Sequence, residues 1–414
     1  MEKIKIGVYG TDVANLTVQY CQAADNAILT AVCEPNPLWL DAFSKSAAAN
    51  GIRCYADLDA FLQEDMEAVI LSSEYATDQT RLAIRCLEAG KHVLGGLMPC
   101  ETMAEAVELV EAVEKSDKTF AFAETHSYFP ISMEMYRLYR SGKMGKFQYG
   151  EGEYLHSVEE YWPDIAYGDP TAWRNTQYAT FYCAHSIGPI LHATGLRPVR
   201  VTAFEAPRNG ISDRTGALGG AFAVMLLQLE NGGLLKCNHG FAISRTSIWY
   251  SMYGSLGRAE SARDDSEAGD ILKLYTNLSE YDGDGACSVK AYEPRTELTP
   301  LAETYHSHGG SHFYSTWHFI EKLRGNPDAN VIDVYEAINM TIPGILGYTS
   351  IRNGNVPVEI PDFRDPKQRE PYRHDTACVN PAKAGDQLLP SFSDGNPVVP
   401  QEVYDKQRLL WESR

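Results

Sequence analysis

Two side chains capable of acid–base chemistry, Tyr182 and His185, stand three positions apart in the segment 182–189. If this segment opens a helix, the spacing places the phenol and the imidazole on one face, one turn apart. Imidazole titrates near neutral pH and a neighbouring phenol can relay or polarise a proton, so the pair could exchange a proton with a substrate hydroxyl. The same spacing also suits two core residues with polar ends, and spacing alone favours this purely structural interpretation.

Composition and net charge limit the kinds of molecule that the protein is expected to bind. The chain has 414 residues, of which 44% are apolar and 22% charged, as in a globular protein long enough for two domains. A net charge of −19 argues against a nucleic-acid groove and against an anionic membrane surface. We therefore expect a small partner that is neutral or cationic.

Cysteine usage and the chain start bear on location. The nine cysteines are scattered without a Cys-x-x-Cys pair, which is typical of reduced thiols. The first residues enter a strand pattern without a signal-peptide pattern, and no apolar run approaches membrane-spanning length. These features predict a soluble cytoplasmic protein with no nucleic-acid and no membrane partner.

The first part of the chain alternates short apolar runs with amphipathic stretches. Strands are predicted at residues 4–9, 27–33, 68–72, 92–95 and 119–123. Helices are predicted between them at residues 13–23, 38–50, 78–89 and 103–115. This α/β alternation predicts a doubly wound parallel sheet, a Rossmann-type dinucleotide-binding domain over residues 1–125.

The pattern then changes to longer alternating strands. A helix is predicted at 130–141, followed by strands at 147–156, 199–205, 221–229, 233–238, 247–253, 258–261 and 271–275. Helices return at 312–323 and 334–348. We expect an α+β domain over residues 126–353, with an open, mostly antiparallel sheet and helices on one face. Residues 354–414, rich in proline until a short helical pattern at 400–412, should wrap over the same subunit or a neighbouring one.

The turn after the first strand, where a pyrophosphate would sit on the next helix, comprises Gly10, Thr11, Asp12 and Val13. Only Gly10 fits a Gly-x-Gly-x-x-Gly fingerprint, because Asp12 and Asn15 stand at the other glycine positions. A carboxylate at position 12 should repel a pyrophosphate unless its side chain turns away.

Glu34 ends the second predicted strand. An acid at this place accepts hydrogen bonds from the adenosine ribose hydroxyls and disfavours a 2′-phosphate, which predicts NAD rather than NADP. A solvated strand end is an equally good interpretation of this residue alone.

Segments 7–15, 32–37, 87–94 and 141–146 follow the layout of the Gfo/Idh/MocA oxidoreductases, and the chain resembles that family over about residues 3–350. The resemblance implies a Rossmann domain, a second open-sheet domain, NAD(P) and a sugar or polyol substrate.

Segments 152–156, 173–174, 182–189 and 308–310 are similar to one branch of the family, which contains the NAD-dependent glycoside hydrolases of family 109 and glycoside 3-dehydrogenases. In that branch a Tyr-x-x-His pair borders the nicotinamide and the sugar C3 hydroxyl, and a tyrosine in a Gly-x-Tyr-x-His strand serves proton transfer at C2. The resemblance implies that Tyr182 and His185 form the first pair, and that Tyr154 with His156 forms the second.

Two segments depart from the family pattern. Met98 stands where most members have a lysine, and methionine cannot move a proton, which leaves His185 or Tyr182 as the base. The Thr-Pro-Asn-His turn expected beside the nicotinamide ribose is replaced by residues 72–75, among which Ser72 and Glu74 are expected to face the cofactor. These changes bear on cofactor affinity more than on the fold.

Other aromatic and ionisable residues are candidates for ligand contacts. Trp173 and Arg174 could supply a stacking plane and a cation beside the cofactor, although buried structural use is equally compatible. His126 and Tyr128 fall where the first sheet gives way to the second domain, a common place for clefts, and are predicted to contact substrate, with Glu124 a further candidate.

The histidines of segment 306–312 are the remaining candidates. His308 precedes two glycines and is predicted to contact substrate. His306 and His312 lie close in sequence, but no carboxylate sits among the three histidines at ligand spacing, so no metal site is predicted.

We therefore expect an NAD-dependent oxidoreductase that acts on a ring hydroxyl, C3, of a sugar or glycoside. His185 would be the base, Tyr182 would hold the same hydroxyl, and Tyr154 would remove the C2 proton of a 3-keto sugar. One alternative is a redox-neutral glycoside hydrolase or lyase acting through that 3-keto intermediate, and another is a catalytically silent subunit or sugar-binding protein. An open sheet face predicts a homo-oligomer by family analogy.

Overall fold

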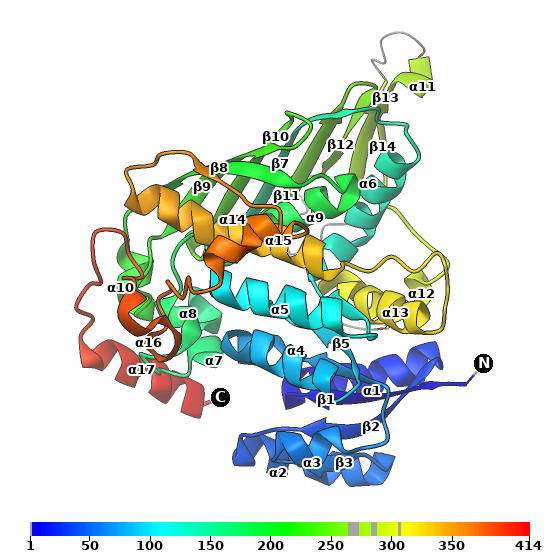
Figure 1. Ribbon diagram of the computed structural model, residues 1–414, viewed down its shortest axis with the longest axis vertical. Coiled ribbons are helices and arrows are strands. Elements are labelled where there is room, and N and C mark those ends of the chain that lie inside the picture. Colours follow the sequence, from blue (N-terminus) through cyan, green and yellow to red (C-terminus); the bar gives the residue numbers. More distant parts are fainter. Residues whose placement is uncertain (1, 264–272, 283–287, 305–307) are drawn as a thin grey trace. The chain divides into compact units, whose positions relative to one another are not determined.

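The computed structural model describes residues 2–263, 273–282, 288–304 and 308–414 (Figure 1). Its contacts divide the chain into two compact units. The first unit comprises Met1–Glu101, Glu105–Tyr128 and Arg295–Ile338, and the second comprises Thr102–Ala104, Phe129–Pro294 and Asn339–Arg414. The contacts therefore group residues 295–338 with the first unit, although the chain reaches them after the second sheet. The predicted boundaries at residues 125 and 353 stay predictions.

The first unit is built on a six-stranded sheet of order β3-β2-β1-β4-β5-β6, with parallel pairing throughout. The strands are β1 Ile4–Tyr9, β2 Ala27–Cys33, β3 Arg53–Tyr55, β4 Ala68–Leu71, β5 His92–Gly95 and β6 Phe120–Phe122. The predicted doubly wound architecture is confirmed. The prediction missed β3 because its few residues are partly exposed and show no periodicity.

The helices of this part are α1 Thr11–Ala24, α2 Pro37–Ala47, α3 Leu58–Leu62, α4 Gln79–Glu88, α5 Met103–Lys115, α12 Thr299–Ala302 and α13 Ser311–Leu323. Asn36 shows why α2 begins where it does, since its side chain accepts a hydrogen bond from the Leu38 amide and Pro37 occupies the first turn. The fully buried Ile6 and Val8 of β1 lie in the core, and Tyr20 of α1 packs on Phe313 of α13 with ring centroids 5.4 Å apart.

The second unit is built on a nine-stranded sheet of order β14-β13-β12-β11-β7-β10-β9-β8-β15. The strands are β7 Phe147–Ser157, β8 Pro198–Glu205, β9 Phe222–Leu229, β10 Leu234–Gly240, β11 Ala242–Gly254, β12 Gly257–Ser261, β13 Leu274–Leu278, β14 Lys290–Tyr292 and β15 Val358–Glu359. All neighbours pair antiparallel except β7 and β10. This confirms the predicted open, mostly antiparallel sheet.

Its helices are α6 Pro130–Arg140, α7 Trp162–Ala166, α8 Trp173–Thr176, α9 Ala184–Thr194, α10 Gly210–Thr215, α11 Ser279–Asp282, the later part of α14 Val334–Arg352, α15 Pro366–Arg369, α16 Pro381–Ala384 and α17 Gln401–Glu412. Helix α9 lies directly on β7, because a Cβ built at Gly152 would come 1.6 Å from the Ser186 carbonyl oxygen. Only glycine at position 152 permits this approach.

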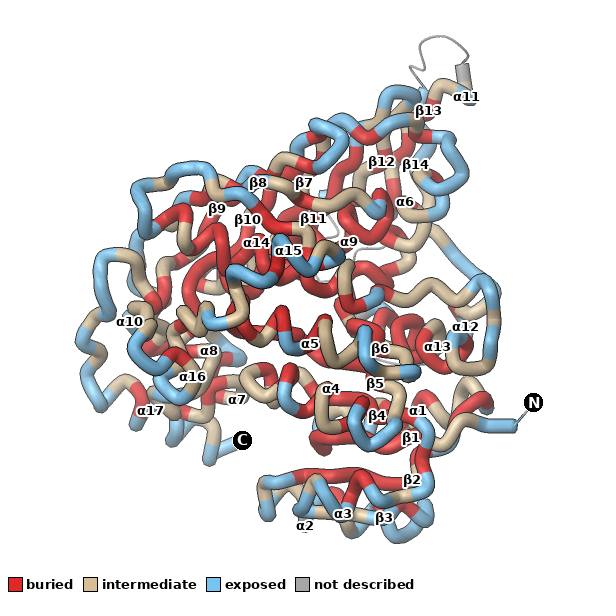
Figure 2. Tube along the Cα trace, in the orientation of Figure 1, coloured by how far each residue is buried: buried red, intermediate tan, exposed pale blue. Residues whose placement is uncertain are grey.

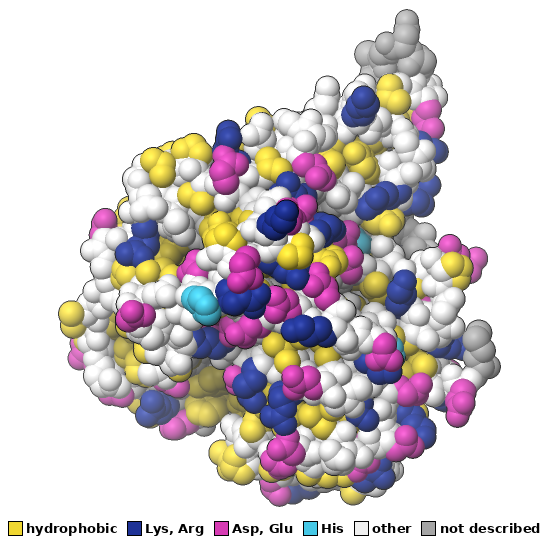
Figure 3. Space-filling model, viewed as in Figure 1, with side chains coloured by type: hydrophobic (Ala, Val, Ile, Leu, Met, Phe, Trp, Pro, Cys, Tyr) yellow, Lys and Arg dark blue, Asp and Glu magenta, His cyan; other side chains and the backbone are white. Residues whose placement is uncertain are grey.

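The sheet register explains its two faces. Val201, Ala203, Met225 and Leu227 of β8 and β9 are fully buried, while the alternate residues Phe204 and Leu226 are exposed. Buried residues follow the strands of both sheets (Figure 2). On the face drawn in Figure 3, acidic and basic side chains are interspersed. Among the described residues, no helix combines the length and the apolar character needed to cross a bilayer.

The C-terminal extension packs on the second unit of its own chain. Strand β15 pairs with β8 at the sheet edge. In α17 the Tyr404 hydroxyl donates to the Gly216 carbonyl at 2.9 Å, and the Gln407 amide donates to the Arg214 carbonyl at 2.9 Å. The extension therefore acts as part of this unit.

Candidate active site

Four rings meet on the second unit where α9 lies against β7 and β10. They belong to Tyr154 of β7, Tyr182, His185 of α9 and His239 of β10, and we call them the ring cluster. The Tyr154 ring centroid lies 4.8 Å from that of His185 and 5.7 Å from that of His239, and Tyr182 lies 4.7 Å from His185. Their exposures are 8%, 5%, 5% and 1%, in chain order, so the cluster is largely shielded from water.

The Tyr182–His185 contact arises differently from the helical arrangement that the spacing predicts. Helix α9 begins at Ala184, so Tyr182 lies in the preceding turn. The two rings nevertheless meet edge to face, at an interplanar angle of 89°. The Tyr250 hydroxyl donates to the His185 carbonyl at 2.6 Å and holds the first turn of α9 to β11. Phenol and imidazole therefore lie together by tertiary packing.

Tyr154 and His156 are two positions apart on β7, which places both on one face of the strand. Their ring centroids are 5.4 Å apart. The Tyr154 ring also lies 6.2 Å from the Tyr182 ring. Tyr154 therefore joins its own pair with His156 to the pair formed by Tyr182 and His185.

Arg174 of α8 adds a positive charge beside the cluster. Its guanidinium carbon lies 3.9 Å from the centroid of the Trp173 ring and 5.0 Å from that of Tyr182. A cation over these rings is attracted to their faces and favours negative charge nearby. The predicted pair Trp173 and Arg174 thus lies against the phenol of Tyr182.

Sequence reasoning missed His239 and its neighbour Phe241. His239 stacks on Tyr154 at 11°, and its Nδ1 atom has no hydrogen-bond partner among the described residues. Burial lowers the pKa of His239 to about 3, which keeps the ring neutral at neutral pH. The predicted strand ended at Asn238, two residues before the end of β10, although the alternation of Leu235 and Cys237 on the buried face points to His239 next.

In the first unit, the turn after β1 has the shape of a dinucleotide turn. Gly10 has φ 105°, and a Cβ there would come 2.4 Å from the Ser72 Cβ atom, so only glycine fits. Burial raises the pKa of the Asp12 carboxylate, and the neighbouring Ser72 side chain and Val13 N–H oppose that rise. The carboxylate therefore lies at the start of α1, where a pyrophosphate would bind. The Thr11 N–H, in the same turn, donates to Glu34.

Glu34 is fully buried, so the interpretation as a solvated strand end is wrong. One oxygen accepts from the Thr11 amide at 3.0 Å and from the Thr11 hydroxyl at 3.1 Å. The other accepts from the Asn36 amide at 2.8 Å and from the Tyr75 hydroxyl. These donors fill the lone-pair directions of a carboxylate, so a ribose hydroxyl would have to displace one of them.

The segment around Met98 is held against the end of β4. The Gln79 side chain donates to the Ser72 carbonyl at 2.6 Å and accepts from the Gly96 amide at 2.9 Å. The hydroxyl of Ser73, in the turn that also contains the partly buried Glu74, accepts from the Leu97 amide at 3.1 Å. Met98 is fully buried and brings no proton-transfer group to this place.

His126 and Tyr128 lie in a short 3-10 turn, Thr125–Tyr128, and both are buried. The Tyr128 hydroxyl donates to the Asn330 carbonyl at 3.2 Å and accepts from the Ile332 amide at 3.3 Å, which favours a structural role. Glu124 accepts from the Ser127 amide at 2.8 Å, and burial raises its pKa. Substrate contact by this turn stays a prediction.

His308 begins a 3-10 turn, but its side chain lies outside the described residues, as does all of His306. Within the described parts of the chain, no group of three or more side chains of the kinds that bind metals is found.

Two family models match separate parts of the chain. Residues 4–124 match the oxidoreductase family with an NAD-binding Rossmann fold, Gfo/Idh/MocA, and residues 297–369 match the C-terminal domain of glycosyl hydrolase 109. Three features of the first unit fit an NAD cofactor: the turn at Gly10, the N-terminus of α1 and the buried Glu34. Binding of a ribose at Glu34 requires that one of its present donors, such as the Tyr75 hydroxyl, release it.

Individual proteins agree with these matches. A glycosyl hydrolase family 109 protein of Solibacter usitatus is 22% identical over 403 residues, covering 87% of this chain and 88% of its own. An alpha-N-acetylgalactosaminidase of Shewanella oneidensis is 20% identical over 323 residues, covering 73% of this chain and 70% of its own. The WlbA dehydrogenase of Bordetella pertussis, solved with NADH and UDP-GlcNAcA, superposes with a TM-score of 0.65 at 18% identity, covering 87% of this chain and 98% of its own.

The predicted resemblance, the NAD cofactor class and the oxidoreductase assignment are confirmed by these matches. Residues 4–124 are thus similar to the NAD-binding Rossmann domain of the Gfo/Idh/MocA oxidoreductases, and residues 297–369 are similar to the C-terminal domain of glycosyl hydrolase 109.

Proposed function

We propose that this protein oxidises a ring hydroxyl, at C3, of a sugar or glycoside with NAD as hydride acceptor. The observation that carries the proposal is the ring cluster, in which a buried imidazole contacts two phenols, with the Arg174 guanidinium against one of them. Buried, mutually positioned acid–base groups are what proton transfer to and from a substrate requires.

The roles follow from the chemistry of the groups. NAD, when bound, supplies the hydride acceptor. His185 takes the hydroxyl proton as the C3 hydrogen leaves with its electron pair, and Tyr182 holds the same hydroxyl. Burial keeps the His239 imidazole neutral, so its role in this proposal is to form a hydrogen bond with the substrate and not to act as a base. Gly10 to Val13 and Glu34 hold the dinucleotide once the Tyr75 hydroxyl has left Glu34.

A second function, redox-neutral glycoside hydrolysis or elimination, is favoured by the glycosyl hydrolase 109 match of residues 297–369. Once C3 is a ketone, the C2 proton is acidic and Tyr154 can remove it, while the group at C1 leaves with its bonding electrons. Water then adds and the hydride returns to C3. The contacts of the Tyr154 ring with the rings of His185 and Tyr182 support this role.

One assay separates these functions. The purified protein is first denatured and its supernatant is assayed for NAD(H), and the native protein is then incubated with NAD and a panel of glycosides. Oxidation yields NADH or a 3-keto sugar, whereas hydrolysis yields free sugar without net NADH. If neither product appears and no NAD(H) is bound at saturating cofactor, the protein is a silent subunit or sugar-binding protein and the proposal fails.

We also propose that the protein is a cytoplasmic homo-oligomer. The location rests on the scattered cysteines, and the assembly on the exposed Phe204 and Leu226 of the uncovered sheet face. A monomer by light scattering at micromolar concentration would contradict the assembly.

A further inference from the structure

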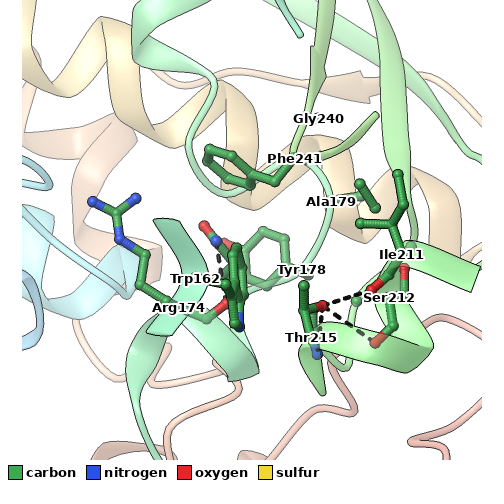
Figure 4. A pocket seen from close by; sticks show the side chains of 14 residues that line it. Trp162, Arg174, Tyr178, Ala179, Ile211, Ser212, Thr215, Gly240 and Phe241 are labelled. Atoms are coloured by element: carbon green, nitrogen blue, oxygen red, sulfur yellow. Dashed lines mark hydrogen bonds between the residues drawn. The ribbon is translucent and has the colours of Figure 1, made fainter. Parts of the chain in front are cut away.

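Arg174 of α8 brings a positive charge to the ring cluster that no described group of the chain neutralises. Its guanidinium lies over the rings of Trp173 and Tyr182, and the residue is only partly buried. The side-chain nitrogens form no hydrogen bond and no ion pair with a described residue. In Figure 4 the guanidinium end of Arg174 lies apart from the other labelled side chains, and no dashed line reaches it.

Neighbouring arginines are paired, which makes Arg174 different. Arg208 pairs with Asp213 at 3.0 Å, and Arg214 of α10 pairs with Glu159 at 2.5 Å. Helix α10 lies close to Arg174, because residues of both line the small hollow drawn in Figure 4. Guanidinium groups that are shielded from water are normally hydrogen-bonded or paired. The N–H donors of Arg174 are therefore available to a ligand.

The backbone of Arg174 is fixed by its neighbours. Asn175 is 1% exposed, and its side chain donates to the Asp169 carbonyl at 2.7 Å and accepts from the Trp162 indole at 2.8 Å. The Gln177 side chain donates to the Arg174 carbonyl at 3.3 Å. Since the segment is anchored and the guanidinium already lies on two rings, a ligand that binds it has little side-chain motion to freeze.

Arg174 and the proposed base are within reach of one sugar. The guanidinium carbon lies 5.0 Å from the Tyr182 ring centroid, which in turn lies 4.7 Å from that of His185. A hexose with a hydrogen bond at each end spans about 10 Å, so it can contact both groups. We propose that the substrate is a glycoside of a sugar acid, a hexuronate, whose C5 carboxylate binds Arg174 while its C3 hydroxyl contacts His185. This inference rests on the proposed oxidation at C3.

The charge and shape of the guanidinium favour a carboxylate over a phosphate. Its planar fork matches a carboxylate with two parallel hydrogen bonds. A phosphate monoester carries close to two negative charges at neutral pH and would need a second cation. Among the described residues that line the hollow, Arg174 is the only charged one. One positive charge is therefore matched by the single negative charge of a sugar acid.

Methyl glycosides of glucuronic and galacturonic acid, each compared with the neutral glucoside or galactoside, test the carboxylate by itself. The full-length protein is titrated by calorimetry with NADH present, so that no oxidation occurs. The uronide of at least one pair should bind about tenfold to 100-fold tighter than its neutral counterpart, the effect of a charge-assisted hydrogen bond. Arg174→Gln should abolish this preference, and Arg174→Lys should keep part of it, since an ammonium group keeps the charge but lacks the fork.

Arg214→Gln is the matched control, because it removes one positive charge from an exposed arginine of nearby α10. It should leave the uronide preference intact. Equal losses in Arg174→Gln and Arg214→Gln would show that the preference follows net charge, and would overturn the inference. Tighter binding of glucose 6-phosphate or glucose 6-sulfate than of either uronide would also overturn it.

NAD titration and product analysis separate this inference from the proposed function. Arg174→Gln should leave NAD affinity unchanged. Weaker NAD binding in this variant with the uronide preference intact would assign Arg174 to the dinucleotide phosphates, and turnover of glycosides without any uronide preference would leave it no carboxylate partner; either result overturns the inference alone. Uronides that bind through Arg174 but yield no NADH, 3-keto product or free sugar would overturn the proposed function and leave the carboxylate site standing.

Discussion

The turn after β1 and the ring cluster differ in how their polar atoms are partnered. In the turn, both oxygens of the Glu34 carboxylate accept hydrogen bonds from protein donors. In and beside the cluster, His239 Nδ1 and the Gln177 oxygen are buried without a hydrogen-bond partner among the described residues. A ligand that binds Glu34 must compete with the chain itself, whereas no described donor of the chain holds the two atoms of the second region.

The largest expected effect tests whether the cluster performs chemistry. His185→Gln should lower kcat by about 100-fold to 10,000-fold, as expected for loss of a general base, with little change in NAD affinity. His192→Gln is the matched control, because His192 is also buried on α9 but stacks on Tyr136, away from the cluster. Equal losses in both variants would show that the helix, and not the base, was damaged.

A second expected effect concerns the cluster's buried imidazole. The folded pKa of His239 is about 3, below its ordinary value of 6.5, so protonation favours the unfolded chain and stability is lost as pH falls below about 6.5. Between pH 7 and pH 4.5 this group should cost about 2.5 kcal/mol of unfolding free energy. Urea unfolding of wild type and His239→Phe at both pH values measures the difference. Identical pH dependence in the two proteins would contradict burial of a neutral imidazole.

In the cofactor turn, Asp12→Gly should tighten NAD binding by about tenfold, because it removes a negative charge from the helix start where the pyrophosphate binds. Asp12→Asn is the control, since it keeps the size and removes the charge, and its affinity should be intermediate. Isothermal titration with NAD measures both. If affinity stays unchanged in the glycine variant, the carboxylate does not compete with the dinucleotide.

The smallest expected effect concerns the hydrogen bond from Tyr75 to Glu34. Tyr75→Phe removes one donor from Glu34 and should tighten NAD binding about threefold to fivefold, the effect of freeing one acceptor. The same variant should lower the melting temperature without NAD, because a buried carboxylate loses a partner. The two changes have opposite signs, which distinguishes competition from general damage. Weaker NAD binding would instead mean that Tyr75 helps to hold the cofactor.

Sequence pattern was sufficient for most strands of both sheets and for the longer helices, since strands such as β1 and β2 are short apolar runs that are largely buried. It could not find β3 or α3, which are too short to show a period. In the cluster, Tyr182 and His185 were found by residue type and spacing and Tyr154 by resemblance, whereas His239 lay one residue beyond the predicted strand. The Tyr75–Glu34 contact joins residues 41 positions apart and depends on a side-chain direction, which no spacing rule supplies.

The contacts of α17 have a consequence for how firmly the neighbouring helices are held. Tyr404 and Gln407 donate hydrogen bonds to backbone carbonyls at the end of α10. The Trp411 ring lies 5.2 Å from that of Tyr167, directly after α7 and its Trp162. Helix α10 and the end of α7 are therefore stabilised by the last turns of the chain, and a protein shortened before α17 is expected to unfold at a lower temperature.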